Sequence, residues 1–466
     1  MGHKHSRPKK AFAFDSKENQ SIENKNIKKI AEDNISKSSF EFIGIIGRGG
    51  FGKVWKVLYK KTKKIFAMKK MSKCKIIDKR SEHSIKAERD LLSKMNHPFI
   101  INMHFCFQDA DFLYIAMDLL TGGDLRYQIF KQKIFNEEQT KFFISCIILS
   151  LEYIHTNNIL HRDLKPENLV MDSQGYLRLT DFGIAKVYRK ENSKDTSGTP
   201  GYMAPEVMNA QNHTIAVDYF ALGVIGYELM MKKRPYLGKN RKEIKEKIMS
   251  HQAQVKKNQV PAGWSVESAD FINRLLQRKP ANRLGLRGPT EVKEHLWFRG
   301  YDWKNLYLSK LKAPFFPKKG DNFDFRYCNA PEKMGPETEE RYRQIKGSQK
   351  FKDGFAEFYY FNRYSNKNNN EINKESGPLS KLVFKNPHLE YLNEEEIDYD
   401  RQSNNDKKSN YSHKIRENNI IGMNSKNNIF GIGDEQYSIM KKLPSSRSTA
   451  TLLKGYNKRP LSSAFQ

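Results

Sequence analysis

A short segment of the chain, residues 161–168, carries polar side chains that suit phosphoryl transfer. It reads His-Arg-Asp-Leu-Lys-Pro-Glu-Asn. Asp163 can orient a hydroxyl and accept its proton, Lys165 can neutralise charge on the moving group, and Asn168 can hold a metal ion. Asp181, in a later Asp-Phe-Gly sequence, adds a carboxylate that can chelate magnesium across phosphate oxygens. These residues predict phosphoryl transfer from a magnesium nucleotide to a hydroxyl.

A glycine-rich segment lies between two expected strands near the start of the chain. A strand is predicted over 40–46, and a second one leads up to residue 59. In a dinucleotide-binding βαβ unit, glycines with this spacing would lead into a helix, whereas here they lead into another β-rich run. We therefore expect a hairpin whose glycines let the backbone approach phosphates closely. The glycines are Gly47, Gly49, Gly50 and Gly52.

These motifs, intact and in this order, resemble the eukaryotic protein kinases. The resemblance implies an α+β bilobal fold, with a β-rich N-lobe over 40–120 and a mainly helical C-lobe over 121–298. It also implies ATP and Mg²⁺ as cofactors. Lys165 matches the serine/threonine kinases, and the hydroxyl of Thr199 is expected to bridge Asp163 and Lys165.

Further positions take nucleotide-binding roles from this resemblance. Lys69, on a strand expected over 65–69, is implied to bind phosphates, and Glu88, on a helix expected from 81 to 95, is its implied ion-pair partner. Met117 is implied to be the gatekeeper of the adenine pocket. The other implied nucleotide contacts are Ile46, Val54, Ala67, Val170 and the backbone of Asp118 and Leu120.

Other residues of the kinase-like region are expected to act as scaffold. The apolar run within residues 137–155 predicts a buried core helix. The resemblance implies a buried ion pair between Glu206 and Arg283. It also implies that Asp218, at the start of a very apolar helix, anchors the backbone of the 161–168 segment.

The residues after the C-lobe narrow the resemblance. Pro-Phe-Phe-Pro at 314–317 and Asn-Phe-Asp at 322–324 are similar to the C-terminal extension of the AGC group, which includes the cyclic-nucleotide-dependent kinases. This extension is expected over 299–361, with Phe323 against the nucleotide site. Within the group, the sequence at 118–127 and the Met-Gly start resemble the "yet another novel kinase" branch.

Two aromatic residues near the end of this extension resemble the hydrophobic motif of the group. Phe355 and Phe358 are implied to dock in an N-lobe pocket beside the helix of Glu88, which would favour the inward position of that helix. Tyr359 stands where the group usually has a phosphorylatable Ser or Thr, so regulation in the usual way is not expected.

Three acidic residues stand where AGC kinases that prefer basic peptides keep theirs. They are Asp124, Glu167 and Glu228. Because arginines on a peptide need paired acceptors, we expect protein substrates with Arg or Lys two or three residues before the phosphorylated Ser or Thr.

A basic pocket is implied for Arg162 and Lys186, which in the family receives an activation-loop phosphate. The usual phosphothreonine position holds Asp195. Either Asp195 acts as a permanent but weaker anion, or the neighbouring Thr196 is phosphorylated instead. A carboxylate has less charge than a phosphate, so the first alternative predicts partial constitutive activity.

The formal net charge of +29 favours anionic partners. No compact basic module for nucleic acid is recognisable, so we expect no specific nucleic-acid partner. The four cysteines form no Cys-x-x-Cys pair, which argues for a reducing compartment. We expect a cytoplasmic protein.

Both ends of the chain are polar. Residues 1–39 are expected to form a flexible basic leader, and its first six residues fit the pattern for myristoylation at Gly2. Nearby basic residues would supply the second signal needed for peripheral attachment to the inner membrane surface. The alternative is an ordinary basic N-terminus. Residues 362–466, rich in Asn and Lys, are expected to be unstructured.

Two rival functions stay open from the sequence. A pseudokinase would bind nucleotide without turnover, and it predicts loss of Lys69, Asp163, Asn168 or Asp181, all of which are present. A membrane-surface scaffold would depend on the acylated, basic N-terminus rather than on phosphoryl transfer.

Overall fold

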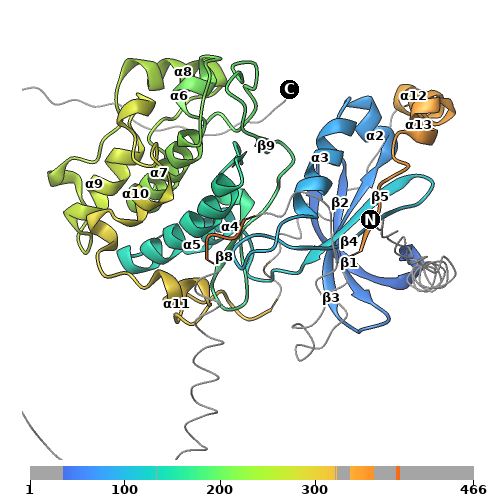
Figure 1. Cartoon of the computed structure of the whole chain (residues 1–466), viewed down its shortest axis with the longest axis horizontal. Helices are drawn as coiled ribbons and strands as arrows, with labels where there is room; N and C mark the ends of the chain where they lie inside the picture. Colours follow the sequence, from blue (N-terminus) through green and yellow to red (C-terminus); the bar gives the residue numbers. More distant parts are fainter. Residues whose placement is uncertain (1–34, 133, 321, 323–335, 362–384, 389–466) are drawn as a thin grey trace, which may run out of the picture. The chain divides into compact units, whose positions relative to one another are not determined.

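The computed structural model of the chain describes residues 35–132, 134–320, 322, 336–361 and 385–388. These residues form the expected bilobal α+β fold, with a β-rich N-lobe and a mainly helical C-lobe (Figure 1). Gly2 and Phe323 lie outside the described residues. Within the described ranges, no helix is both long enough and apolar enough to span a bilayer.

The N-lobe is built on one antiparallel sheet with the strand order β1-β2-β3-β5-β4-β10. Its strands are β1 (Phe40–Gly49), β2 (Gly52–Tyr59), β3 (Ile65–Ser72), β4 (Met103–Gln108), β5 (Phe112–Asp118) and β10 (Tyr360–Phe361). β1 and β2 pair as far as Gly49 opposite Gly52, so the glycine-rich segment forms the predicted hairpin. A Cβ atom on Gly52 would lie 1.9 Å from the carbonyl oxygen of Lys70, so this position on β2 excludes any side chain.

Two helices follow β3, and only the second was expected from the sequence. Helix α2 (Lys73–Asp78) begins where the side chain of Ser72 accepts a hydrogen bond from the Lys75 N–H. Helix α3 (Glu82–Leu92) carries Glu88 and ends earlier than the predicted residue 95. After it the chain turns with hydrogen bonds to carbonyls three residues back, such as Lys94 N–H to Leu91 O.

The C-lobe is centred on two long helices. Helix α5 (Glu137–Thr156) starts with a capping box between Asn136 and Gln139 and forms the predicted core helix. Helix α7 (Ala216–Met231) is apolar on nearly all sides, as expected for a helix enclosed by others. The other C-lobe elements are α4 (Leu125–Gln132), α6 (Pro205–Met208), α8 (Arg241–Ser250), α9 (Val266–Leu275), α10 (Pro289–Lys293), α11 (Trp303–Tyr307), β6 (Ile159–Leu160), β7 (Leu169–Met171), β8 (Leu177–Leu179) and β9 (Lys186–Val187).

The C-terminal extension returns to the N-lobe. Helices α12 (Pro336–Gly347) and α13 (Gln349–Asp353) lie beside α2 (Figure 1). Arg341 Nε lies 2.6 Å from Asp78 Oδ1, and Lys350 Nζ lies 2.5 Å from Glu82 Oε1. The chain then adds β10 to the edge of β4, so the extension completes the sheet that it packs against.

Residues 385–388 correct the expectation that the whole of 362–466 is unstructured. The backbone N–H and carbonyl of Lys385 both bond to the side chain of Asn157. His388 is 1% exposed, and its ring contacts those of His97 and Tyr307. These four residues therefore dock on the kinase-like region. The rest of 362–466 lies outside the described residues.

The predicted ion pair between Glu206 and Arg283 is present and buried. The two guanidinium nitrogens lie 2.7 and 3.0 Å from the two carboxylate oxygens, and the side chains are 4% and 0% exposed. Arg283 also donates to the carbonyl oxygens of Ala216 and Gln277. It thereby ties helices α6 and α7 to the segment after α9.

Replacement of Arg283 by Met should strongly destabilise the fold. The carboxylate of Glu206 would stay buried without its partner, which costs about 3–5 kcal/mol. The matched control is Arg287→Met, because Arg287 is 82% exposed and pairs with Glu291 on the surface, a pair worth about 0.5 kcal/mol. Chemical denaturation measures both. A loss for Arg283→Met as small as that of the control would contradict the structural role of the pair.

Candidate active site

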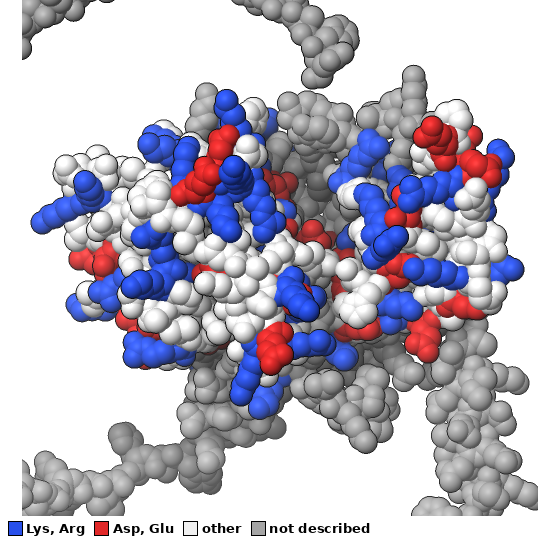
Figure 2. All heavy atoms as spheres, turned by 90° about the horizontal axis from the view of Figure 1, so that it is seen from above, with Lys and Arg blue, Asp and Glu red and all other residues white. Residues whose placement is uncertain are grey.

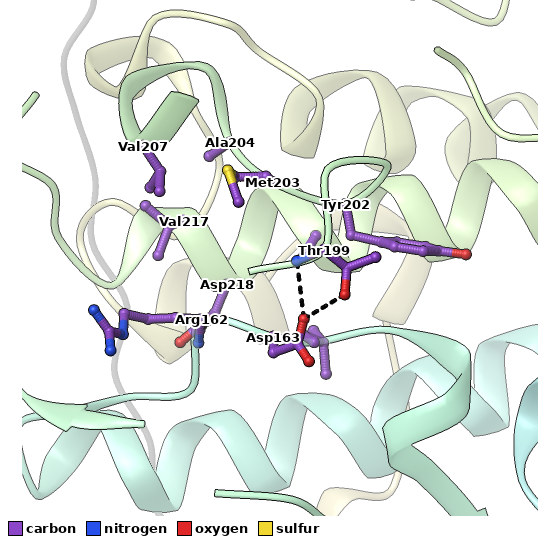
Figure 3. A pocket seen from close by; sticks show the side chains of 11 residues that line it. Arg162, Asp163, Thr199, Tyr202, Met203, Ala204, Val207, Val217 and Asp218 are labelled. Carbon is purple, nitrogen blue, oxygen red and sulfur yellow. Dashed lines mark hydrogen bonds between the residues drawn. The ribbon is translucent and has the colours of Figure 1, made fainter. Parts of the chain in front are cut away.

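The carboxylate of Asp163 is held by hydrogen bonds to both of its oxygens. Oδ1 accepts from the backbone N–H of Thr199 at 3.0 Å and from its hydroxyl at 2.6 Å (Figure 3). Oδ2 accepts from Lys165 Nζ at 2.6 Å and from Asn168 Nδ2 at 3.2 Å. Lys165 Nζ also reaches the Thr199 hydroxyl at 3.0 Å, so the predicted Thr199 bridge is present.

Asp218 holds the backbone on which Asp163 sits. Its carboxylate accepts from the N–H groups of His161 and Arg162, at 3.0 and 2.8 Å, and bonds to the His155 ring. Burial would raise the pKa of Asp218, but the bond to His155 and nearby positive charges lower it below its usual value. Asp218 therefore stays ionised, and the anchoring predicted for it is observed.

Lys69 on β3 forms the expected ion pair with Glu88 on α3. Lys69 Nζ lies 2.7 and 3.0 Å from the two Glu88 oxygens, and the Glu88 side chain is 3% exposed. Burial would lower the pKa of Lys69, but the carboxylates of Glu88 and Asp181 more than offset this effect and raise it. The chain therefore brings the strand lysine, the helix glutamate and Asp181 into one electrostatic neighbourhood.

Asn168 and Asp181 fit a divalent metal that is shared with phosphates. Thr180, directly before Asp181, donates its N–H and hydroxyl to the Asn168 carbonyl, at 2.9 and 3.1 Å. Because Asn168 Nδ2 donates to Asp163, its amide oxygen is the atom left for a cation. In the described ranges, no three His, Cys, Asp or Glu residues form a metal-binding group. Two oxygen ligands suit a Mg²⁺ ion whose other ligands come from substrate phosphates and water.

Several of the residues implied to contact the nucleotide lie on adjacent strands of the N-lobe sheet. Val54 on β2 stands opposite Gly47 and Lys69, and Ala67 on β3 stands opposite Met117 on β5. Their roles as nucleotide contacts stay predictions. Partly or fully buried side chains occur at Ile46, Val54, Ala67, Met117, Leu120 and Val170.

The side chain of Asp118 is engaged away from the adenine edge. Its oxygens lie 2.7 Å from His104 Nε2 and 3.0 Å from Arg178 Nη1. The backbone contact implied for Asp118 stays a prediction, and its N–H already donates to the Asn102 carbonyl at 3.1 Å. Phe323 lies outside the described residues, but its neighbour Asn322 donates to the carbonyl oxygen of Thr121, at the start of the C-lobe.

The three acids expected to meet a basic substrate are partly occupied from within the chain. Arg126 on α4 bonds to both Glu167 and Glu228. Asp124 accepts from the Tyr127 N–H at the start of α4, and burial raises its pKa. Glu167 and Glu228 are therefore already paired with an arginine of the chain, and the predicted role of the three acids in substrate binding stays a prediction.

Asp195 lies in the basic pocket that was predicted for a phosphate. Its carboxylate pairs with Lys186, and Oδ2 lies 3.5 Å from Arg162 Nη1. Burial would raise the pKa of Asp195, but the hydrogen bond from Lys186 and the charge of Arg162 lower it below its usual value. Thr196 takes part through its carbonyl oxygen, which accepts from Arg241. The structure brings together Arg162, Lys186 and Asp195, while Thr196 lies beside them.

The aromatic residues of the C-terminal extension dock on the N-lobe. Phe355 and Phe358 are both 1% exposed. Arg89, directly after Glu88 on α3, donates to the Glu357 carbonyl, and its guanidinium stands 5.6 Å from the Phe358 ring centre. The extension therefore contacts the helix that positions Glu88. Tyr359 is 45% exposed.

Sequence reasoning missed two residues of this region, Arg126 and Tyr202. The Tyr202 hydroxyl donates to Glu228 and accepts from Arg126. Arg126 follows Asp124 by two positions on the same short segment, which was a signal that this arginine lies near the acids. Its pairing with Glu228 depends on how α4 and α7 pack against each other. A local sequence pattern does not predict that packing.

Comparisons with known proteins agree with this geometry. The model of the protein kinase domain family matches residues 40–298. A probable serine/threonine-protein kinase of Dictyostelium discoideum is 41% identical over 63% of this chain and 64% of its own length. The serine/threonine-protein kinase AtPK1/AtPK6 of Arabidopsis thaliana is 39% identical, over 60% of this chain and 59% of its own.

A human relative, ribosomal protein S6 kinase alpha-6, is 38% identical over 63% of this chain and 39% of its own length. The chain thus spans less than two thirds of the length of these curated relatives. The resemblance to the "yet another novel kinase" branch stays a prediction. The protein kinase domain model matches more than half of the residues, so the chain belongs to the protein kinase family.

Proposed function

We propose that this protein is a serine/threonine protein kinase that transfers the γ-phosphoryl group of ATP to protein hydroxyls with Mg²⁺. One observation carries the proposal. Asp163 is bonded to Lys165, Thr199 and Asn168, while the ion pair between Lys69 and Glu88 is closed. Both halves of a phosphoryl-transfer site are therefore in place in the same structure.

The residues divide the work as follows. Mg²⁺-bound ATP supplies the phosphoryl group and a leaving group whose charge the metal neutralises. Asp163 would orient the acceptor hydroxyl and take its proton, and Lys165 would neutralise charge on the phosphoryl oxygens. Lys69 would hold the nucleotide phosphates, and Asn168 and Asp181 would hold the metal.

The activation segment supports activity without phosphorylation. Because Asp195 already pairs with Arg162 and Lys186, it supplies the anion that orders this segment, although with less charge than a phosphate. Phosphorylation of Thr196 is the alternative.

Membership of the kinase family implies that the substrates are proteins. We further propose that basic substrates are weakly favoured. Asp124, Glu167 and Glu228 bring three negative charges against the one positive charge of Arg126. The remaining negative charge would attract a basic peptide through the solvent, without a specific pair.

We also propose that this cytoplasmic protein attaches peripherally to the inner surface of the membrane. It rests on the Gly2 pattern and the basic residues that follow it. On the face drawn in Figure 2, basic side chains of the described residues are spread over both lobes, with acidic ones between them.

Asp163→Asn should lower the phosphorylation rate of a Ser/Thr peptide library by about 10²–10⁴-fold, because the amide cannot accept the hydroxyl proton. Radiolabelled ATP transfer measures the rate. Asp270→Asn, on the surface of α9, is the matched control and should keep wild-type activity. A folded wild-type protein that binds ATP and transfers no phosphate to any peptide would favour the pseudokinase.

Asp195→Ala should reduce the activity of unphosphorylated protein about tenfold, since losing about 1.4 kcal/mol from the ordered segment shifts its population by that factor. Thr196→Ala should leave activity unchanged. Mass spectrometry of the active protein reports phosphate on Thr196. The opposite pattern, with phosphorylated Thr196 and an inactive Thr196→Ala variant, would show that Asp195 does not replace the phosphate.

Gly2→Ala should abolish incorporation of a labelled myristoyl chain and shift the protein from anionic vesicles to the soluble fraction. A single chain contributes a binding constant of about 10⁴ M⁻¹, so its loss leaves only the basic residues. Ser16→Ala lies in the same leader but outside the myristoylation pattern, so it is the control and should keep both labelling and vesicle binding. Equal sedimentation of wild type and Gly2→Ala would contradict acylation-dependent attachment.

A further inference from the structure

The guanidinium of Arg126 is fully engaged with two glutamates beside the candidate active site. Nε lies 2.9 Å from Glu167 Oε1, while Nη1 and Nη2 lie 2.8 and 3.1 Å from the two oxygens of Glu228. The pair with Glu228 has the two parallel bonds that make arginine–carboxylate recognition strong. All three guanidinium nitrogens therefore have acidic partners inside the chain.

Tyr202 connects this cluster to Asp163. Its hydroxyl donates to Glu228 Oε2 at 2.6 Å and accepts from Arg126 Nη2. Tyr202 is also one of the residues that line the pocket of Asp163 and Thr199 (Figure 3). Glu167 is four residues after Asp163 in the chain. The Arg126 cluster thus borders the place where an acceptor hydroxyl would meet Asp163.

A substrate arginine would have to compete with Arg126 for these oxygens. Both oxygens of Glu228 are used, and its side chain is 9% exposed, so there is little room for a second cation. If a peptide arginine displaced Arg126, one set of ion pairs would replace another. Such an exchange gives no net gain in pairing, whereas the displaced guanidinium would lose its partners.

We propose that Arg126 is a specificity-determining residue that occupies the arginine-binding subsite formed by Glu167 and Glu228. Ser/Thr peptides that are uncharged two and three residues before the hydroxyl are then phosphorylated about as efficiently as peptides with arginine there. This inference rests on the proposed kinase function. In this arrangement, Glu167 and Glu228 do not pair with a cation of the substrate. A basic substrate is attracted only weakly, by the negative charge that Arg126 does not neutralise.

Four matched peptides test the proposal, with Arg at the second position before the serine, at the third, at both, or Ala at both. For the wild-type kinase, kcat/KM should differ by no more than about threefold across the set, as expected of charges screened by salt. Arg126→Met keeps the apolar stem and removes the guanidinium. It should raise the preference for an arginine peptide to at least about tenfold, because the glutamates then accept the peptide's guanidinium.

Three further variants make the result specific. Arg274→Met removes an arginine from an exposed pair on α9 and should keep the wild-type ratios. The double variant Arg126→Met with Glu228→Gln removes the acceptor as well and should lose the gained preference. If Arg126→Met does not fold, Arg126→Gln keeps an amide donor for Glu228 and should give a gain in the same direction.

The outcomes separate the two proposals. A wild-type preference for arginine of tenfold or more would overturn the role of Arg126, as would turnover by Arg126→Met with unchanged ratios. If the wild type phosphorylates none of the peptides and no protein, the proposed function falls, and this inference falls with it. Turnover of the alanine peptide by the wild type keeps the proposed function in either case.

Discussion

The buried carboxylate of Asp218 is the constraint on which the active-site geometry depends. It accepts the N–H groups of His161 and Arg162, and it remains charged because His155 bonds to it. Arg162 adopts a left-handed backbone with φ 68°, which is unfavourable for a side chain of this size. Two charge-assisted bonds to a buried anion offset that strain. The turn they enforce directs Asp163 toward Thr199.

Charges inside the site are balanced by partners from the same chain. Asp195 lies where a phosphate is expected, and Arg126 lies where a substrate guanidinium is expected. In both places, an internal residue fills a subsite that an external group fills in kinases with the usual pattern. A partner within the same chain has a high effective concentration, so an external group competes with it poorly. We therefore expect both sites to respond little to an added phosphate or to a substrate cation.

Short motifs predicted the parts of this fold that depend on neighbouring residues in the chain. The hairpin over Gly47–Gly52, the Asp163 segment and the ion pair of Lys69 with Glu88 were predicted in this way. Arg126 was missed because its partner Glu228 is more than a hundred residues away, on α7. Residues 385–388 were missed because a four-residue anchor in a polar stretch has no periodic pattern.

The position of Arg126 links specificity to stability. The side chain of Glu228 is 9% exposed, and burying a carboxylate without a cation would be costly. A kinase that takes its arginine from the substrate must leave this acid unpaired, or hydrated, until the substrate binds. Here Arg126 on α4 supplies the cation permanently, and the Tyr202 hydroxyl donates a further hydrogen bond to Glu228. The free enzyme therefore does not have the cost of a buried, unpaired carboxylate. The free energy that would otherwise be released on substrate binding is already used in the fold. Pairing of Glu228 within the free enzyme therefore reduces the free energy that an upstream arginine of the substrate could gain there.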